Sequence, residues 1–379
     1  MTSKHNYGQD KIMTRQILDR KDFKLGLFSA NCSGGLAVTK IDERWGATWE
    51  ENLAMAKVAD QLGFDFLLPI ARWIGYKGDT NFHGSVLDPI VWAAALISST
   101  ERINVFSTIH TAFNHPMVTA KQMATLDQLG GGGRAGLNIV AGWNQPEYEA
   151  MGTLMPHEHD DRYSFAQEWA DVVLAAWQEP GIFNMETKHF KLRGAESEPK
   201  PLGNKVPILN AGSSGQGRVY AAKNSDFVFT IVPDVATGAT IAATVKEQAR
   251  TEFGREVGVF TLGHVVCRDT REEAQEYLEY YARDNADWGA VDYLMGLQGL
   301  HAQSFTPEML ATMRDRFASG HGSLPLVGTP EDVADQITAL YEAGFDGMTL
   351  AFVDYVTELE YFGQKVLPIL EARGVRLPR

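Results

Sequence analysis

Side chains that could carry chemistry gather just after one apolar segment. The run of residues 135–141 is apolar except for Asn138, and it breaks at Gly142, after which Trp143 and Glu147 follow. An apolar run of this length bounded by glycine is typical of a buried strand. Polar groups at the carboxyl end of such a strand are where α/β enzymes hold reacting molecules. The amide of Asn138 can donate and accept at once, so a buried Asn138 must find hydrogen-bond partners. The alternative is a strand that ends in an ordinary capped loop.

A second group of residues could hold an anion. The turn at residues 210–217, Asn-Ala-Gly-Ser-Ser-Gly-Gln-Gly, follows an apolar strand and opens a predicted helix. Small residues there let backbone N–H groups approach a phosphate at the helix N-terminus, and Ser214 and Gly215 are the best donors. Arg162 and Tyr163 carry groups that suit phosphate oxygens. The turn alone is weak evidence, and an ordinary glycine-rich connection remains the alternative.

Other polar side chains lie near the predicted strand ends. Thr108 sits in an apolar strand and needs a hydrogen-bond partner, which is commonly the backbone. His83, His110 and His115 lie in or beside the second and third strand-to-helix loops and could orient a substrate or move a proton near neutral pH. A single histidine is more often structural, so both readings stay open.

Strand-like and helix-like patterns alternate through most of the chain. Eight apolar strand patterns are each followed by a helical pattern, which predicts an α/β fold, a (β/α)8 TIM barrel with insertions. A doubly wound open sheet is the alternative. The expected strands are residues 23–28, 64–70, 103–109, 135–141, 207–211, 227–232, 259–267 and 348–352.

The barrel is expected to be one domain with additions. Residues 1–22 are polar and predict an N-terminal arm, and residues 23–375 predict a single barrel domain. Residues 181–205 predict a short hairpin and a Pro-bounded connection. Residues 287–325 predict a mobile lid on the catalytic face, or else a helical insertion that serves oligomer contacts.

Composition excludes several classes of protein. Apolar residues make up 44% of the chain and charged residues 22%, as in ordinary globular proteins. No run of 18 apolar residues is present, so no membrane span is expected. The formal net charge of −14 disfavours nucleic acid as a partner. Cys32 and Cys267 lack disulfide and metal-ligand patterns, so we expect buried thiols, no metal site and a cytoplasmic location.

Several strings resemble one enzyme family. The string at residues 142–152, Gly-Trp-x-x-Pro-Glu-Tyr-Glu-x-Met-Gly, is similar to one in the pyrimidine branch of the bacterial-luciferase-like flavin monooxygenases. The strings at residues 33–38 and 159–163, and the pair His115-Pro116, are similar to ones in the dimethyl sulfone branch. The resemblance covers roughly residues 22–375 and implies the luciferase-like form of the barrel.

The resemblance implies roles at the flavin ring. It places four residues around the flavin N5 edge, where the pyrimidine branch holds molecular oxygen. These residues are Leu68, Thr108, Asn138 and Trp143. It also implies flavin contacts from Glu147, Ala71 and Arg72. The last two depart from the family's Ile-Lys in residue type, so a backbone contact would survive the change more readily than a side-chain contact. His115 is implied to lie on the substrate side.

The resemblance also implies a cofactor and its supply. Arg162, Tyr163, Ser214 and Gly215 would bind the phosphate of FMN. No dinucleotide fingerprint follows the first strand, so a separate NAD(P)H-dependent flavin reductase is expected to supply the reduced form. The partners are then a small-molecule substrate, O2 and, transiently, the reductase. A homodimer or homotetramer is expected.

The expected function is oxygenation of a small organic substrate by reduced FMN and O2, with cleavage of a C–S or C–N bond. A sulfone or alkanesulfonate is favoured, and a pyrimidine-like amide comes next. Two alternatives share the barrel: a hydride-transfer oxidoreductase that uses coenzyme F420, and a catalytically silent flavin-binding protein. A metal hydrolase is possible on the fold alone.

Overall fold

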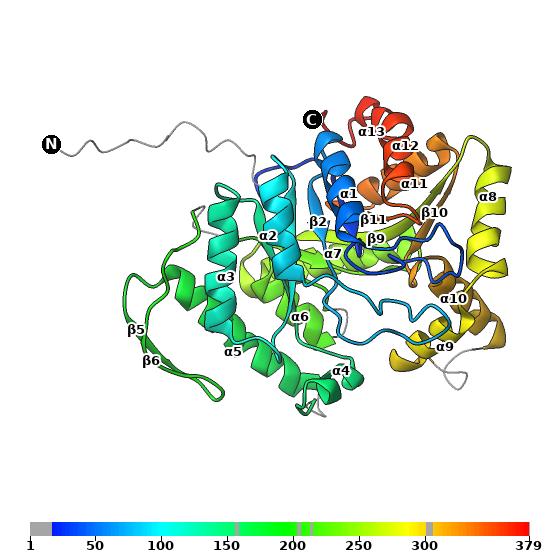
Figure 1. Ribbon diagram of the computed structural model, residues 1–379. Helices are drawn as coiled ribbons and strands as arrows, with labels where there is room; N and C mark the ends of the chain where they lie inside the picture. The colour runs from blue at the N-terminus through cyan, green and yellow to red at the C-terminus, as the bar shows by residue number, and fades with distance from the viewer. Residues whose placement is uncertain (1–16, 156–158, 203–205, 213–214, 301–305, 379) are drawn as a thin grey trace.

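A closed barrel of eight parallel strands forms the centre of the molecule (Figure 1). The computed structural model describes residues 17–155, 159–202, 206–212, 215–300 and 306–378. The last strand of the barrel, β11, returns to β1, and β8 pairs with β9, so the sheet closes. The predicted (β/α)8 fold is confirmed. Its strands are β1 (Lys24–Phe28), β2 (Phe66–Leu68), β3 (Asn104–His110), β4 (Ala135–Val140), β7 (Ile208–Asn210), β8 (Phe227–Phe229), β9 (Gly258–Cys267) and β11 (Gly347–Ala351).

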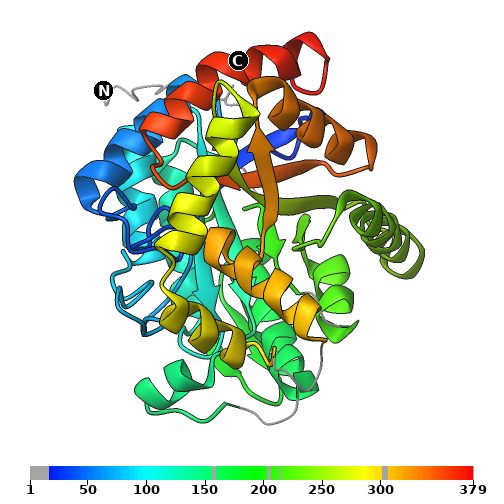
Figure 2. The same ribbon diagram turned by 90° about the vertical axis from the view of Figure 1, so that its right-hand side faces the viewer.

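Helices surround the barrel and cover its outer face (Figures 1 and 2). Several start at local signals that the sequence carries. Thr48 and Thr270, for example, form capping boxes with the glutamates three residues on. The helices are α1 (Trp49–Gln61), α2 (Pro89–Ser99), α3 (Pro116–Leu129), α4 (Gln145–Ala150), α5 (His159–Gln178), α6 (Gly215–Asn224), α7 (Val235–Phe253), α8 (Arg271–Glu279) with a π-turn η1 (Tyr280–Asp284), α9 (Trp288–Leu297), α10 (Pro307–Gly320), α11 (Pro330–Glu342), α12 (Thr357–Lys365) and α13 (Leu367–Ala372).

A ninth parallel strand, β10 (Leu324–Gly328), corrects the sequence reading. The insertion predicted at residues 287–325 runs directly into this strand, which the sequence analysis did not identify. The first half of the long strand β9 pairs with β11, and its second half, from Gly263 to Cys267, pairs with β10. The strand was missed because Pro325 and Gly328 interrupt its apolar pattern.

The two predicted additions occupy different sides of the barrel. The strands β5 (Phe183–Glu186) and β6 (Lys191–Ala195) form an antiparallel hairpin that projects beside α3 and α5 (Figure 1). The helices α9 and α10 follow α8 across the face that is turned to the viewer in Figure 2. The two additions therefore do not share a surface.

A layer of phenylalanine rings fills the middle of the barrel. Phe66 stacks on Phe260 with 5.2 Å between ring centroids, and Phe260 stacks on Phe227 at 4.5 Å. Phe106 meets Phe66 edge-on at 5.7 Å. The neighbouring strands supply glycine: a Cβ on Gly26 would lie 2.6 Å from the ring of Phe66. Large rings are therefore accommodated only because the facing positions carry no side chain.

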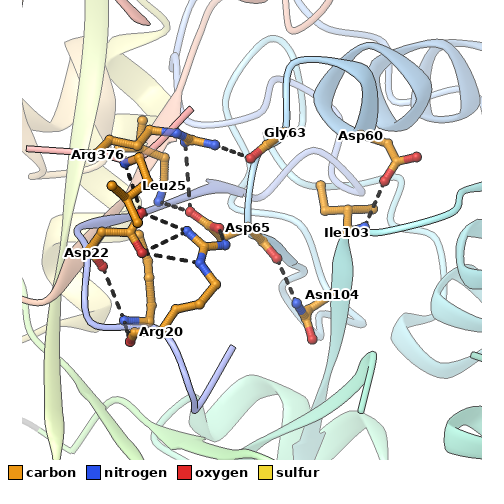
Figure 3. Close-up of polar contacts among 11 residues, drawn as sticks. Arg20, Asp22, Leu25, Asp60, Gly63, Asp65, Ile103, Asn104 and Arg376 are labelled. Carbon is orange, nitrogen blue, oxygen red and sulfur yellow. Dashed lines mark hydrogen bonds and ion pairs between the residues drawn. The ribbon is translucent and has the colours of Figure 1, made fainter. Parts of the chain in front are cut away.

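A buried ionic cluster lies at the amino-terminal end of the barrel strands (Figure 3). The carboxylate of Asp65 lies at the start of β2 and accepts hydrogen bonds from Arg20 and, at 2.8 Å, from the backbone N–H of Leu25. The guanidinium of Arg376 lies 3.8 Å from it. Arg20 also pairs with Asp22 at 3.0 Å. The cluster ties both ends of the described chain to the barrel, so the described part of the expected N-terminal arm is packed.

His264 connects β9 to the end of α10. Its Nδ1 lies 3.0 Å from the hydroxyl oxygen of Ser323, which donates to the carbonyl of Gly320 at 2.6 Å. A Cβ on Gly320 would lie 2.3 Å from that ring, so the close approach requires glycine. Burial lowers the pKa of His264 to about 3, and the charge of Arg316 acts in the same direction. The imidazole is therefore neutral in the folded protein at pH 7.

Replacing Asp65 by Asn should lower the free energy of unfolding by roughly 3–5 kcal/mol, because two arginines would lose their buried counter-charge. Urea unfolding followed by circular dichroism measures the change. Asp79→Asn is the matched control, since Asp79 is exposed and pairs only with Lys40 at 3.5 Å. It should cost less than about 1 kcal/mol. Equal losses in the two variants would contradict the role of the cluster.

Acid should destabilise the wild type more than a His264→Gln variant. The folded pKa of His264 is lowered, so the unfolded state takes up the proton first as the pH falls below about 6.5. The contribution of this histidine is thus fully present above that pH and is lost as the pH falls toward 3. The difference between the two proteins should change by roughly 1.4 kcal/mol per pH unit between pH 6 and 4. Parallel stability curves would refute this assignment.

Candidate active site

A cavity of about 1010 Å³ lies directly above the phenylalanine layer, at the carboxyl ends of the strands. Side chains two residues apart on a strand share a face, so the next inward layer forms its floor. That layer consists of Phe28, Leu68, Thr108, Asn138, Phe229 and Leu262. Known small-molecule pockets span about 300–1,000 Å³, so this cavity is large enough for a cofactor together with a second molecule.

Thr108 and Asn138 form a polar pair on this otherwise apolar floor. The parallel register of β3 and β4 sets them side by side. The Asn138 side-chain nitrogen donates to the Thr108 hydroxyl at 3.0 Å, and that hydroxyl donates to the carbonyl of Pro69. The side-chain oxygen of Asn138 is buried and has no hydrogen-bond partner among the described residues. An unpaired buried acceptor in a cavity wall points to a ligand that donates to it.

An ion pair lies at the side of the cavity, after β2. Arg72 lines the cavity, and its Nη1 lies 2.9 Å from Oε1 of Glu147, with side-chain exposures of 5% and 1%. The same oxygen accepts the backbone N–H of Trp73 at 3.0 Å. The guanidinium lies over the rings of Tyr76 and Trp143, at 5.0 and 5.2 Å from their centroids. Burial raises the pKa of Glu147, and the neighbouring Arg72 opposes that shift.

Two histidines of the cavity wall are neutral at pH 7. Burial lowers the pKa of His110 and of His321 to about 3, and the charge of Arg72 adds to both shifts. His110 Nδ1 lies 4.0 Å from Oε2 of Glu147, too far for a hydrogen bond. His321 adopts a left-handed backbone with φ of 56° at the end of α10. Non-glycine residues in this conformation are uncommon and cluster at functional sites.

The predicted anion-binding residues lie partly in the same cavity. Arg162 and Tyr163 line it, near the turn that follows β7. Asn210 shapes that turn by accepting the Gly212 N–H at 2.8 Å and donating to the Ile139 carbonyl at 2.6 Å. Gly215 begins α6 and is not among the lining residues, and Ser214 lies outside the described residues.

The structure separates other predicted residues from the cavity wall. His115 is the N-cap of α3, where its Nδ1 accepts the Met117 N–H at 3.3 Å. Glu147 stands behind Arg72 and does not itself line the cavity. His83 is buried beneath the first loop, with Nε2 2.6 Å from the carbonyl oxygen of Gly35. Leu68, Ala71, Arg72 and Trp143, by contrast, all line the cavity.

The insertion that was predicted as a lid forms a roof over the cavity, and the sequence reasoning did not name the side chains of α10 that line it. Met309, Met313 and Phe317 of α10 line the cavity at a spacing of four residues, which places them on one face of the helix. This spacing is the sequence signal that could have identified them. The roof is tied to the second loop by the carboxylate of Asp287, which accepts from the backbone and the hydroxyl of Thr80, each at 2.7 Å.

Within the part of the chain that the structure describes, no group of three or more His, Cys, Asp or Glu side chains could hold a metal ion. No helix there is long and apolar enough to cross a membrane.

Comparisons with known proteins agree with this geometry. Residues 23–347 match the sequence profile of the luciferase-like monooxygenases. The chain is 32% identical to the FMNH(2)-dependent dimethylsulfone monooxygenase of Pseudomonas fluorescens (strain Pf0-1) over 369 residues, which covers 94% of this chain and 98% of that one. It is 29% identical to the pyrimidine monooxygenase RutA of Enterobacter cloacae subsp. cloacae over 358 residues, 93% of this chain and 97% of the relative.

Among solved structures, riboflavin lyase (RcaE), determined with modified FMN and riboflavin, superposes with a TM-score of 0.84. The two chains are 23% identical, and the match covers 94% of this chain and 93% of that one. At this identity the likeness concerns the fold alone. The profile match extends over most of the barrel, and the dimethylsulfone relative is similar over nearly its whole length. The chain therefore belongs to the luciferase-like monooxygenase family.

Proposed function

We propose that the protein is a monooxygenase that uses reduced FMN and O2 to oxygenate a small organic substrate. Cleavage of a C–S or C–N bond would follow in a sulfone, an alkanesulfonate or a pyrimidine-like amide. The observation that carries the proposal is the polar pair Thr108–Asn138 on an apolar floor, in one cavity with Arg162 and Tyr163. Family membership and the two similar monooxygenases support the reaction class.

The residues present fit a bound flavin. The unpaired oxygen of Asn138 offers an acceptor to a ring N–H, and the apolar side chains around it suit the faces of a flat ring. Arg162 and Tyr163 offer donors that suit a phosphate. The turn at Asn210, followed by the N-terminus of α6, adds a place where backbone N–H groups favour an anion.

Each part of the cavity then has a task. Bound reduced FMN would supply the electrons that activate O2. Asn138 and Thr108 would orient the ring edge, since their own hydrogen bonds fix their side chains. Met309, Met313 and Phe317 would exclude water from the reaction from above. His110 and His321, both neutral, could each donate or accept one hydrogen bond with the substrate.

We also propose that the cofactor is reduced by a separate protein. The name of the dimethylsulfone relative specifies FMNH2, and a separate NAD(P)H-dependent flavin reductase would deliver it to this protein through transient contact. A homodimer or homotetramer in the cytoplasm would be the working form.

Anaerobic photoreduction of the protein with FMN, followed by mixing with air-saturated buffer in a stopped-flow spectrometer, tests the function. We expect tight binding of reduced FMN and substrate-dependent incorporation of one oxygen atom from 18O2, detected by mass spectrometry. Dimethyl sulfone, methanesulfonate and uracil are the first substrates to compare. Failure to bind FMN, with binding of coenzyme F420 in its place, would overturn the proposal in favour of hydride transfer. FMN binding without oxygen incorporation would favour a silent flavin-binding protein.

Replacing Asn138 by Ala should reduce product formation more than FMN affinity. The substitution removes the ring-edge acceptor and the hydrogen bond to Thr108, while Arg162 and Tyr163 remain. We expect a loss of about 10²-fold in product formation, typical of removing one positioned catalytic hydrogen bond, and a much smaller change in Kd from FMN titration. Asn184→Ala, at an exposed position of the hairpin, is the control for losing an asparagine amide. Equal losses of affinity and product would argue against the assigned role.

A further inference from the structure

The charge balance beside the cavity floor narrows the substrate class. Resting on the proposed function, we propose that the side chain of Arg72 contacts the substrate, while the flavin contact implied for residue 72 is made by its backbone. The substrate is then an uncharged molecule with a hydrogen-bond-accepting oxygen. Small anions such as sulfonates and carboxylates would be rejected because Glu147 already neutralises Arg72. A sulfone or a cyclic amide therefore fits this cavity, and an alkanesulfonate does not.

The charge of Arg72 is already paired with a carboxylate. Its guanidinium is the charged group on this side of the cavity, and Glu147 lies against it at 2.9 Å with both side chains almost fully buried. Opposite charges in contact have no net charge and leave the field of a dipole, which falls off faster with distance than the field of a single charge. An incoming anion would meet a neutral pair, and it would lose its hydration without gaining a free counter-charge.

The Arg72–Glu147 pair still offers hydrogen-bond donors to a neutral molecule. Arg72 has five N–H donors and no acceptor, and its part of the cavity wall also contains the ring of Trp143. Glu147 is held in place from behind by the N–H of Trp73. A neutral sulfone or carbonyl oxygen could accept from the guanidinium without separating it from Glu147. The pair thus supplies directed donors with no net charge.

The remaining charges of the cavity wall do not change this balance. His110 and His321 are neutral, as shown above. Arg316 donates to the carbonyl of Pro233 at 2.6 Å, and Glu308 lies on the same helix of the roof and also lines the cavity. Arg162 lies at the other end, where the proposed function gives its charge to the cofactor phosphate. Among the described residues, the pairing of Arg72 with Glu147 therefore sets the charge balance on this side of the cavity, and Arg316 carries its charge on the roof helix α10.

The variant Glu147→Gln removes the counter-charge and keeps an oxygen that can accept the Trp73 N–H. Two pairs of probes are used: dimethyl sulfone against the near-isosteric methanesulfonate, and uracil against orotate, which adds a carboxylate to the same ring. Isothermal titration of the FMN-loaded proteins gives the four Kd values. We expect the wild type to bind each neutral probe at least about tenfold tighter than its anionic partner. The variant should bind methanesulfonate and orotate at least about tenfold tighter than the wild type does.

The control is Glu149→Gln, which removes the same charge two residues further along α4. Glu149 is exposed, and within the described part of the chain its side chain accepts from Gln145 at 3.0 Å and from no other group, so its loss should leave all four Kd values unchanged. Adding Arg72→Gln to Glu147→Gln should abolish the gain for anions, which assigns the gain to the uncovered guanidinium.

Wild-type protein that binds either anion as tightly as its neutral partner would overturn the inference, and so would a Glu147→Gln variant with no gain for anions. These results leave the proposed function standing wherever FMN titration and oxygen incorporation are intact. Loss of FMN binding in the wild type would instead overturn the function. FMN titration of each variant, performed first, keeps the two failures apart.

Discussion

The packing of four phenylalanine rings against glycine inside the barrel is the constraint on which the site depends. Phe66, Phe106, Phe227 and Phe260 fill the width of the barrel only because Gly26 and its counterparts on neighbouring strands carry no side chain. A Cβ on Gly136, for instance, would lie 2.5 Å from the ring of Phe106. The layer makes a solid floor, and strand periodicity then places Thr108 and Asn138 one step above it. A smaller ring in this layer would let the floor sink and would move the polar pair away from any ligand.

Much of this arrangement could be predicted from the sequence, because the signals are local. A single polar residue in an apolar run identified Asn138. Thr108 lies in a strand that also contains Asn104 and Ser107, so the family resemblance was needed to select it. The contact between Asn138 and Thr108 follows from the parallel register of adjacent strands. The order of strands and helices likewise follows from the spacing of apolar residues along the chain, because apolar residues face the core.

Other features depend on contacts that no local pattern reveals. Glu147 is 75 positions from Arg72, so its place behind that guanidinium required the fold. The pair His115-Pro116 suggested a residue that contacts the substrate. A proline at the first helical position is also a local signal for a helix start, and in the structure His115 is the N-cap of α3. β10 was hidden because a strand that pairs at the edge of the barrel tolerates proline and glycine.

The Asp65 cluster and the Arg72–Glu147 pair, two of the buried ionic groups in the described residues, differ in what surrounds them. Asp65 lies between two arginines and accepts the Leu25 N–H at the amino-terminal end of the strands, where the two ends of the described chain meet, and it is not among the residues that line the cavity. Arg72 and Glu147 lie beside an open cavity, between aromatic rings. A buried pair is expensive in desolvation, and apolar residues of the same size often stabilise a fold as well. A stability argument therefore accounts for the first pair, which joins distant segments. The second joins neighbouring loops that Asp287 and the roof core already hold together. Its position on the wall favours a role in choosing what the cavity accepts.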